Sequence, residues 1–461
     1  MKSIDKCYID GAWVNAISAT PFAIKSPATN SQIGDVMLGS AADVDAAVAA
    51  AKRAFVSFSK TSKETRIALL ERLQEVFTLR LEEMAQAITA EMGAPISMSR
   101  SSQAGCGIEH IKAFIKALKE QPEREVLSNS DILTRDPIGV VGLITPWKWP
   151  ISQVAQKVLP ALAIGATCVL KPSEYTPLSA ALFAEFVHEA GYPAGVFNLV
   201  FGDGPTVGTA MSRHPGIDMM SFTGSTRAGI MVSKDAADTV KRVTLELGGK
   251  SANLVFADAD LETRVAASVA GCFHNTGQSC NAPTRMLAER SCYAQVQDIA
   301  ARAAAAQRVG DPTQEGSHIG PLFDEMQYNR VQAMIQIGLD EGARLLAGGL
   351  GKPEGLEEGW YVKPTIFADV TNNMRIARDE IFGPVLVIIP FDTEEDAIAM
   401  ANDNDFGLAA FLQTGDAARA ERVADQLRAG TVTINDNSTN YGSPFGGYKQ
   451  SGNGREGGVF G

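Results

Sequence analysis

Two short segments of this chain carry residues that can act together as a nucleophile and a base. Cys280 ends the polar, glycine-containing segment 275–280 (NTGQSC), and Glu246 begins the segment 246–250 (ELGGK). A thiolate attacks electrophilic carbon, and a carboxylate can activate the water that releases what the thiol has captured. The two motifs therefore predict covalent catalysis, with Cys280 as the nucleophile and Glu246 as the general base.

Most of the six cysteines need no chemical role, because a free cysteine is usually a small buried hydrophobic residue. Cys280 differs because a polar loop leads to it. No CxxC pair is present, so neither a disulfide framework nor a metal site is expected. His274, six residues before Cys280, raises the alternative of a cysteine–histidine hydrolase, but nothing else in the sequence supports that pairing. The cysteines expected to be structural are Cys7, Cys106, Cys168, Cys272 and Cys292.

The elements that position these residues alternate between strands and helices from residue 138 onward. Short apolar, β-rich runs are separated by helical stretches or by turns rich in glycine and proline. This alternation predicts an α/β fold with a parallel sheet covered on both faces, as in a doubly wound nucleotide-binding domain. The predicted strands are 138–144, 167–170, 198–201, 219–222, 243–247 and 252–256.

Before and after this region the periodicity also indicates regular elements. Residues 8–14 alternate enough to predict one strand, and segments 42–60 and 63–91 have the spacing of two amphipathic helices. A second αβ region follows Asp260. Its predicted elements are a helix at 261–275, strands near 386–390 and 431–435, and a glycine-rich tail at 444–452.

Two glycine-rich segments are candidates for binding phosphate. Segment 202–208 (GDGPTVG) contains Gly204 and Gly208, and segment 222–229 (FTGSTRAG) follows an apolar strand and opens a helix. Helix N-termini and successive backbone N–H groups bind anions, so Ser225 can contact a phosphate. The alternatives are a tight turn for the first segment and a helix cap for Ser225.

The segment 171–174 (KPSE) follows a predicted strand and suits a ribose. A lysine and a carboxylate three residues apart can hold two vicinal hydroxyl groups. An isolated pair of this kind is more often a surface ion pair. The residues concerned are Lys171, Ser173 and Glu174.

Together these motifs resemble the NAD(P)-dependent aldehyde dehydrogenases, from about Tyr8 to the last residue. The resemblance implies a nucleotide-binding domain, an αβ catalytic domain and a small oligomerisation hairpin. It also implies a reaction: the Cys280 thiolate forms a thiohemiacetal with a small aldehyde, hydride passes to nicotinamide, and a thioester remains. Water activated by Glu246 then releases a carboxylic acid.

The resemblance also assigns cofactor residues one by one. Glu174 bonds the 2′-hydroxyl of the adenosine ribose and repels a 2′-phosphate, which favours NAD over NADP. Glu380 holds the nicotinamide ribose, and Phe382 flanks the nicotinamide. The remaining assigned residues are Thr145, Pro146, Trp147, Lys171, Ser173, Gly204, Gly208, Phe222, Thr223, Gly224, Ser225, Leu247, Gly248 and Gln327.

Domain boundaries and assembly follow from the same resemblance. We expect a nucleotide-binding domain at 1–117 and 137–247, and a catalytic domain at 248–439. Segments 118–136 and 440–461 are expected to serve oligomerisation, as a homodimer or homotetramer. The family continues past Gly461 with one further strand.

One residue departs from the family pattern. The string 146–150 (PWKWP) places Lys148 where the family has an asparagine that donates to the thiohemiacetal oxygen. The lysine charge can stabilise an oxyanion or a thiolate. The longer side chain can also bond Glu246 or Cys280 directly, or turn away so that the donor is lost. Loss of such a donor lowers turnover roughly 100- to 1000-fold.

Three other functions remain alternatives. A catalytically silent NAD-binding relative with a structural or interaction role is favoured only by Lys148. An acylating dehydrogenase that passes its acyl group to coenzyme A is opposed by Glu246, since those relatives lack the base. A thiol hydrolase without a cofactor is opposed by Lys171, Glu174 and Ser225.

Composition restricts the partners and the setting. The formal charge is −12, from 41 basic and 53 acidic residues, which argues against nucleic acids and acidic membranes as partners. No apolar stretch is long enough to span a bilayer, and the first residues lack the apolar core of a secretory signal. A reducing cytoplasm is the expected setting, since a nucleophilic thiol requires one.

Overall fold

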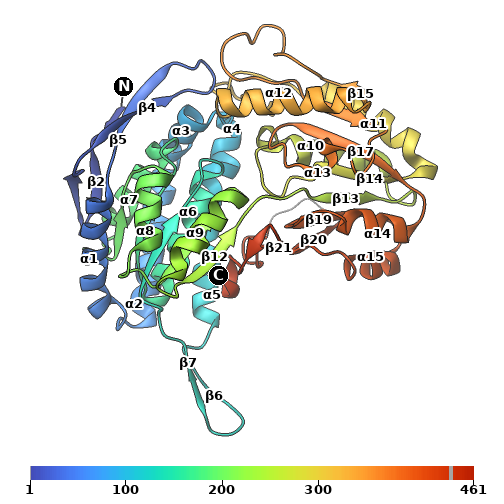
Figure 1. Cartoon of the computed structure of the whole chain (residues 1–461). Coiled ribbons are helices and arrows are strands. Elements are labelled where there is room, and N and C mark those ends of the chain that lie inside the picture. Colours follow the sequence, from blue (N-terminus) through green and yellow to red (C-terminus); the bar gives the residue numbers. More distant parts are fainter. Residues whose placement is uncertain (1, 436–439) are drawn as a thin grey trace.

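The computed structural model describes residues 2–435 and 440–461. Two α/β bodies lie side by side, the first built from the N-terminal half of the chain and the second from the C-terminal half (Figure 1). The chain crosses between them after β12 (Arg242–Glu246) and returns with its last residues to the first body. This architecture confirms the predicted α/β fold class.

The first body contains an eight-stranded sheet in the order β22-β12-β11-β8-β9-β10-β2-β3. Strands β8 to β12 run parallel, and their registers align Ile144 with Lys171 and Thr223 with Glu246 at the carboxyl ends. Ligands bind at this edge in open parallel sheets. The strands are β2 (Lys6–Ile9), β3 (Ala12–Asn15), β8 (Val140–Ile144), β9 (Thr167–Lys171), β10 (Phe197–Leu199), β11 (Met219–Thr223), β12, and β22 (Gly452–Asn453).

Helices cover both faces of this sheet, and apolar side chains from all of them form one continuous core. Pro150 begins α6, directly after the loop that carries Lys148. The helices are α1 (Ala41–Phe58), α2 (Lys63–Leu79), α3 (Leu81–Met92), α4 (Ile96–Met98), a π-helix at Ser99–Ala104, α5 (Gly105–Glu120), α6 (Pro150–Ile164), α7 (Pro177–Glu189), a π-helix at Gly204–Gly208, α8 (Thr209–Arg213) and α9 (Thr226–Ala237).

The second body contains a seven-stranded sheet in the order β15-β16-β17-β14-β13-β19-β20. All neighbouring strands are parallel except the β15–β16 pair at one edge. The strands are β13 (Ala252–Val255), β14 (Arg285–Glu289), β15 (Arg344–Ala347), β16 (Thr365–Ala368), β17 (Val385–Phe391), β19 (Ala409–Gln413) and β20 (Thr431–Ile434).

Helices pack on this second sheet and enclose two apolar clusters. The helix α10 leads into the loop that ends at Cys280. The helices are α10 (Leu261–Phe273), a 3₁₀ turn at His274–Gly277, another at Arg290–Cys292, α11 (Tyr293–Ala306), α12 (Glu325–Asp340), α13 (Arg375–Arg378), α14 (Glu394–Asn402) and α15 (Ala417–Ala424). A last 3₁₀ turn, Gly458–Phe460, packs against α5 of the first body.

Small strands complete the fold. A hairpin of β6 and β7 projects from the first body, and all its strand residues are exposed (Figure 1). The last four residues of the predicted 248–439 domain lie outside the described residues. The small strands are β1 (Lys2–Ile4), β4 (Thr20–Lys25), β5 (Gln32–Leu38), β6 (Arg124–Val126), β7 (Ile132–Thr134), β18 (Phe406–Gly407) and β21 (Tyr448–Lys449).

Three predicted elements were wrong in detail. Residues 8–14 form a hairpin of β2 and β3 rather than one strand, because Asp10 and Gly11 turn the chain with φ of 54° and 78°. The helix predicted at 63–91 is two helices, broken at Arg80, whose φ and ψ of −108° and 19° are not helical. The helix predicted at 261–275 ends at Phe273.

Candidate active site

The loop after β8 turns its side chains toward the second body. Trp149 has a left-handed backbone, with φ of 49°, and stands immediately before Pro150 at the first position of α6. Its indole Nε1 donates a hydrogen bond to the Ser279 hydroxyl at 2.7 Å. This bond ties the Lys148 loop to the loop that carries Cys280.

The Cys280 loop is built from strained backbone that its own side chains stabilise. Asn275 and Thr276 have φ of 53° and 57°, and the Asn275 amide donates to the Gln278 carbonyl at 2.9 Å. Gly277 also has a positive φ, and a Cβ there would lie 2.1 Å from the Gly383 carbonyl oxygen. Glycine is therefore required at this close approach.

Lys148 reaches the sulfur of Cys280. Its Nζ donates a hydrogen bond to Cys280 Sγ at 3.0 Å, and the residues are only 4% and 9% exposed. From the sequence, Lys148 could face an oxyanion, bond Glu246 or Cys280, or turn away; in the structure it bonds Cys280. The hydrogen bond places a lysine nitrogen directly beside the sulfur that would act as the nucleophile.

The other five cysteines lie in surroundings that suppress their reactivity. Burial raises the pKa of Cys7 and Cys292 to about 11. Burial also raises the pKa of Cys106 and Cys272 to about 12, and that of Cys168 further still. A thiol with a raised pKa is neither a nucleophile nor a ready target for alkylation.

Glu246 ends β12 and is 2% exposed. Neither of its carboxyl oxygens has a hydrogen-bond partner among the described residues. Burial and the nearby Glu456 raise the pKa of Glu246 to about 9, although Lys157, Arg455 and Lys148 oppose the shift. An unpartnered carboxyl with a raised pKa suits a proton acceptor that works on a water molecule.

The two glycines after Glu246 make room for two other groups. A Cβ at Gly248 would lie 2.4 Å from the Glu380 carboxylate, and a Cβ at Gly249 would lie 2.4 Å from the Cys280 carbonyl oxygen. The Gly249 N–H also donates to Glu380 at 3.1 Å. The Glu246, Cys280 and Glu380 segments are thus brought together by close backbone contacts.

The glycine-rich tail fixes the strand end from the other side. The Leu247 N–H donates to the Ser451 carbonyl at 2.9 Å, and the Ser451 hydroxyl donates to the Gly248 carbonyl at 2.7 Å. Strand β22 pairs with β12 and places Gly452 opposite Glu246. Sequence reasoning found the tail as a glycine-rich segment but did not connect it to Glu246.

The predicted ribose-binding residues lie at the carboxyl end of β9. Lys171 Nζ donates to the Pro172 carbonyl at 2.9 Å and to Glu174 at 3.3 Å. The Thr145 N–H donates to the Lys171 carbonyl at 3.1 Å, so this turn is joined to the Lys148 loop. Ser173 accepts a bond from the Tyr175 N–H at 3.3 Å, which supports the turn itself.

The predicted phosphate-binding residues stand at the starts of two helical segments. The Ser225 hydroxyl caps α9 by accepting from the Ala228 N–H at 3.3 Å, as the alternative interpretation expected. A Cβ at Gly204 would meet nothing within 4 Å, so the fold does not need glycine there for its own packing. Thr223 Oγ1 is buried without a partner among the described residues. The open space and the unpaired hydroxyl fit a bound nucleotide.

Two of the remaining predicted cofactor residues are aromatic and lie in contact. The Trp147 ring lies 5.7 Å from the Phe382 ring, edge to face. The Gln327 amide donates to the carbonyls of Ile381 and Phe382 at 3.1 and 2.7 Å. Gln327 therefore fixes the 380–384 segment, a supporting contact that sequence reasoning had not foreseen. Of the other predicted residues, Pro146 lies in the loop after β8, Phe222 lies in β11, Gly224 directly follows β11, and Gly208 ends the π-helix that begins at Gly204.

A groove of about 710 Å³ adjoins these loops, which is the size of a small-molecule site. Tyr175 lines one side, directly after Glu174, and Asp324 and Met326 line another, directly before Gln327. No predicted cofactor residue lines it. The neighbouring Phe323 ring stacks on Trp147 at 4.3 Å.

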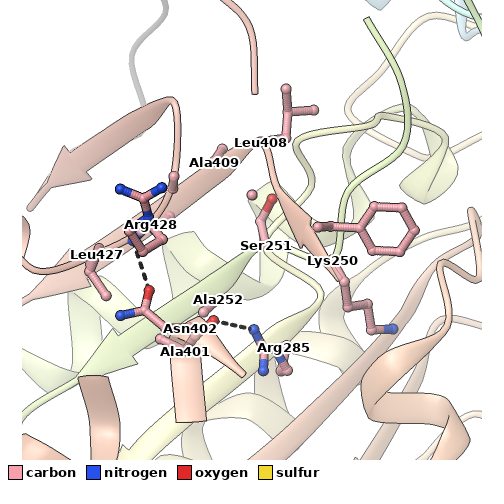
Figure 2. Close-up of a pocket in the computed structure, with 14 residues that line it drawn as sticks. Lys250, Ser251, Ala252, Arg285, Ala401, Asn402, Leu408, Ala409, Leu427 and Arg428 are labelled. Atoms are coloured by element: carbon pink, nitrogen blue, oxygen red, sulfur yellow. Dashed lines mark hydrogen bonds between the residues drawn. The ribbon is translucent and has the colours of Figure 1, made fainter. Parts of the chain in front are cut away.

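A second cavity, of about 20 Å³, adjoins Lys250 at the end of the 246–250 segment and holds at most about one water molecule. Lys250 and Ser251 line it together with Arg285, whose guanidinium donates to backbone carbonyls of α14 (Figure 2). Figure 2 shows the Lys250 side chain directed away from Asn402 and Arg428. This cavity is too small for a substrate.

Sequence reasoning missed a buried ion pair near Glu246. Lys157 on α6 pairs with Glu456 of the tail, and the Ser221 hydroxyl lies beside both. Both charges influence the pKa of Glu246. Only the three-dimensional return of the tail brings them together, so no local sequence signal marks the pair.

Two classes of site find no support in the described part of the chain. No group of three or more histidine, cysteine or acidic side chains there is arranged to hold a metal ion. No helix among residues 2–435 and 440–461 combines the length and apolar character needed to cross a membrane.

Comparison with known proteins covers nearly the whole chain. The model of the "Aldehyde dehydrogenase family" matches residues 13–461. A Pseudomonas 3-succinoylsemialdehyde-pyridine dehydrogenase is 50% identical over 100% of this chain and 97% of its own. The crystal structure of an aldehyde dehydrogenase from Bartonella henselae is 49% identical, with a TM-score of 0.98 over 100% of this chain and 97% of its own.

A further similar structure holds ligands. It is a cysteine-to-alanine mutant of aldehyde dehydrogenase C from Pseudomonas syringae, in complex with NAD⁺ and octanal. It is 51% identical, with a TM-score of 0.97 over 99% of this chain and 94% of its own.

Proposed function

The chain belongs to the aldehyde dehydrogenase family, and we propose that it oxidises an aldehyde to a carboxylic acid with NAD through Cys280 and Glu246. The observation that carries this proposal is the arrangement of the two residues. One is a buried thiol with a lysine nitrogen at its sulfur, and the other is a buried carboxyl with a raised pKa and no hydrogen-bond partner among the described residues.

The first half of the reaction forms a covalent bond to the substrate. The Cys280 thiolate, stabilised by the Lys148 ammonium, attacks the carbonyl carbon of the aldehyde and gives a thiohemiacetal. Lys148 occupies the sequence position where the family has a neutral donor, but its hydrogen bond is to the sulfur. Departure of hydride from that carbon leaves a thioester on Cys280.

The cofactor residues support a dinucleotide across the edge of the first sheet. NAD supplies the hydride acceptor when it is bound. Glu174 and Lys171 would hold its adenosine ribose, the N-terminus of α9 at Ser225 would face a phosphate, and Phe382 would flank the nicotinamide. The carboxylate of Glu174 favours NAD over NADP, because a 2′-phosphate would meet a like charge.

The second half of the reaction releases the acid. Glu246 takes a proton from water, and the water oxygen attacks the thioester carbon. The sulfur leaves as thiolate and returns to the Lys148 ammonium. Because Glu246 has a raised pKa, only a small fraction of the enzyme carries the base form at neutral pH.

Two names among the relatives suggest which aldehydes to try first. The Pseudomonas relative is named for a succinoyl semialdehyde carried on pyridine, and the Pseudomonas syringae structure contains octanal. In this chain the Trp149 and His274 rings lie 5.6 Å apart, and Trp149 bonds the residue next to Cys280. We therefore propose that the aldehyde has an aromatic or apolar body rather than a small polar one.

We also propose that copies of the chain assemble through the projecting hairpin. The exposed β6–β7 hairpin, with Val126 and Ile132 at its surface, suits pairing with a second copy of the chain. A homodimer or homotetramer in a reducing cytoplasm is consistent with these features.

The test measures NADH absorbance after the protein is mixed with NAD and an aldehyde, either 3-succinoylsemialdehyde-pyridine or octanal. It compares the unmodified chain with Cys280→Ala. NADH formation that Cys280→Ala abolishes, without loss of NAD binding, supports the proposal. Near-normal NADH formation by Cys280→Ala would refute it. A requirement for coenzyme A would indicate the acylating alternative, and NAD binding without any NADH would indicate the silent relative.

A further inference from the structure

Lys148 stands where an amine can intercept the acyl group carried by Cys280. We propose that Lys148 is a site of self-acylation: during turnover its Nζ takes the acyl group from the Cys280 thioester and forms a stable amide. This inference rests on the proposed function, since the thioester is the acyl donor.

The distance supports the transfer. Nζ lies 3.0 Å from Sγ, and the acyl carbon of a thioester is bonded directly to that sulfur. The amine therefore lies beside the atom that carries the acyl carbon, and reactants held together in this way react as an intramolecular pair. Lys148 is 4% exposed, so its movement away from the sulfur is restricted.

The charge of the site changes when the thioester forms. A thioester sulfur carries no charge and no proton, so it no longer interacts with Lys148 as the free Cys280 sulfur does. The nucleophilic form of a lysine is the neutral amine, so the ammonium gives one proton to a base before it attacks. Lys148 lowers the pKa of two nearby carboxyl groups, Glu246 and Glu380, and whichever of them is ionised can receive the proton.

Hydrolysis competes with this transfer and is slow near neutral pH. Burial keeps the Glu246 carboxyl largely protonated, so the water that should release the acid lacks its base for most of the time. The thioester therefore persists, and a persistent thioester next to an amine is exposed to aminolysis.

The step is balanced without any further reagent. The amine nitrogen attacks the carbonyl carbon, the carbon–sulfur bond breaks, and a carbon–nitrogen bond forms. The nitrogen loses one proton, which the departing thiolate or a neighbouring carboxylate takes up. The product is an amide on Lys148 and a free thiol on Cys280, and the site is then obstructed and its cation is lost.

Mass spectrometry with hydroxylamine separates the two acyl sites, because neutral hydroxylamine cleaves thioesters but not amides. The first arm incubates the whole protein with octanal and NAD. The second arm uses p-nitrophenyl acetate, which acylates a thiolate without any hydride transfer. Each arm is followed by hydroxylamine treatment, digestion and measurement of the Lys148 peptide, with borohydride omitted so that a reversible imine is not trapped.

The inference predicts up to one hydroxylamine-resistant acyl group per chain on Lys148 in both arms, and a parallel loss of NADH-forming activity. Cys280→Ala should lose the Lys148 label, because the acyl group reaches Lys148 only through the Cys280 thioester. Direct acylation of the lysine by the reagent would persist without the thiol. Lys148→Arg keeps a cation but cannot accept the acyl group, and its progress curves should stay linear.

The outcomes separate the inference from the function on which it rests. A hydroxylamine-labile adduct on Cys280 with no resistant label on Lys148, in either arm, overturns the inference and leaves the proposed function standing. No NADH in the first arm, with label on Lys148 in the second, overturns the proposed function and supports the acyl transfer. Equal labelling of Lys148 in Cys280→Ala overturns the inference.

Discussion

Gly446 lies directly against the carboxyl group of Glu246. A Cβ at position 446 would stand 2.7 Å from Glu246 Oε1 and 2.7 Å from the Gly454 carbonyl oxygen, and its backbone has a φ of +153°. Because residue 446 has no side chain, the tail leaves a small space beside Glu246, the proposed base. No hydrogen-bond partner among the described residues holds the carboxyl group in another position, so its place depends on this space.

Filling this space should damage the second half-reaction more than the first. We expect Gly446→Ala to lower steady-state turnover roughly 10-fold or more, because the carboxyl is displaced from its water. The initial burst of NADH, one per active site, should persist. Gly442→Ala in the same tail is the matched control, since a Cβ there would meet only the Asn440 side chain at 3.5 Å. Equal loss of burst and turnover would show that the tail acts only on the fold.

The pH dependence follows from the pKa of Glu246, raised to about 9. A general base works only when it is ionised, and its ionised fraction grows about 10-fold per pH unit below its pKa. Steady-state turnover should therefore rise from pH 7 to about pH 9 and then level off, as measured by NADH absorbance. Glu246→Gln should lose this rise and accumulate an acyl adduct on Cys280. A profile that is already flat at pH 6 would mean that another residue activates the water.

Several of these features could be predicted from the sequence, and the reasons differ by element. The strands around Lys171 and Glu246 are apolar runs of a parallel sheet, so composition alone identifies them. The β2–β3 hairpin carried a signal that was missed, because Asp10–Gly11 is the dipeptide typical of a two-residue hairpin turn. The break at Arg80 has neither glycine nor proline to mark it.

The contacts that complete the candidate site could not be predicted. Gly446 and Ser451 reach Glu246 and Gly248 from about 200 positions further along the chain, through β22 pairing with β12. Long-range register depends on packing that no local pattern records. Lys148 was visible as a departure, but three directions were open to its side chain, and only the fold directs it to Cys280.

The preference for NAD over NADP tests the proposed role of Glu174. Its carboxylate lies 3.3 Å from Lys171 Nζ and would meet the 2′-phosphate of NADP as a like charge. Glu174→Ser should narrow the affinity gap between the cofactors by roughly 10-fold, or about 1.4 kcal/mol, measured by fluorescence titration. Glu174→Gln, which keeps the size and removes the charge, should share most of this effect. Tighter binding of NADP than NAD by the unmodified chain would contradict this role.

Lys148 is the position where we expect the largest gain in rate. Its ammonium bonds the resting sulfur, and this interaction weakens when the thiolate attacks and its charge moves to oxygen. An interaction that is stronger in the ground state than in the transition state slows the reaction. An asparagine would offer a neutral N–H that can be held in place before the oxyanion develops, which is how such donors act.

We therefore expect Lys148→Asn to raise the initial rate of NADH formation roughly 10-fold or more, the size of one oxyanion donor. NAD affinity should change little, because Lys171, Glu174 and Ser225 lie on other loops. Lys148→Met has a side chain of similar length with neither charge nor donor, so its rate shows the effect of removing the ground-state interaction. The difference between Lys148→Asn and Lys148→Met then shows the effect of the new donor. Initial rates are required, because progressive acylation of Lys148 would lower the later rates of the unmodified chain. If Lys148→Asn is slower than the unmodified chain, the ammonium itself stabilises the oxyanion and this enzyme uses a charged donor in place of the family's neutral one.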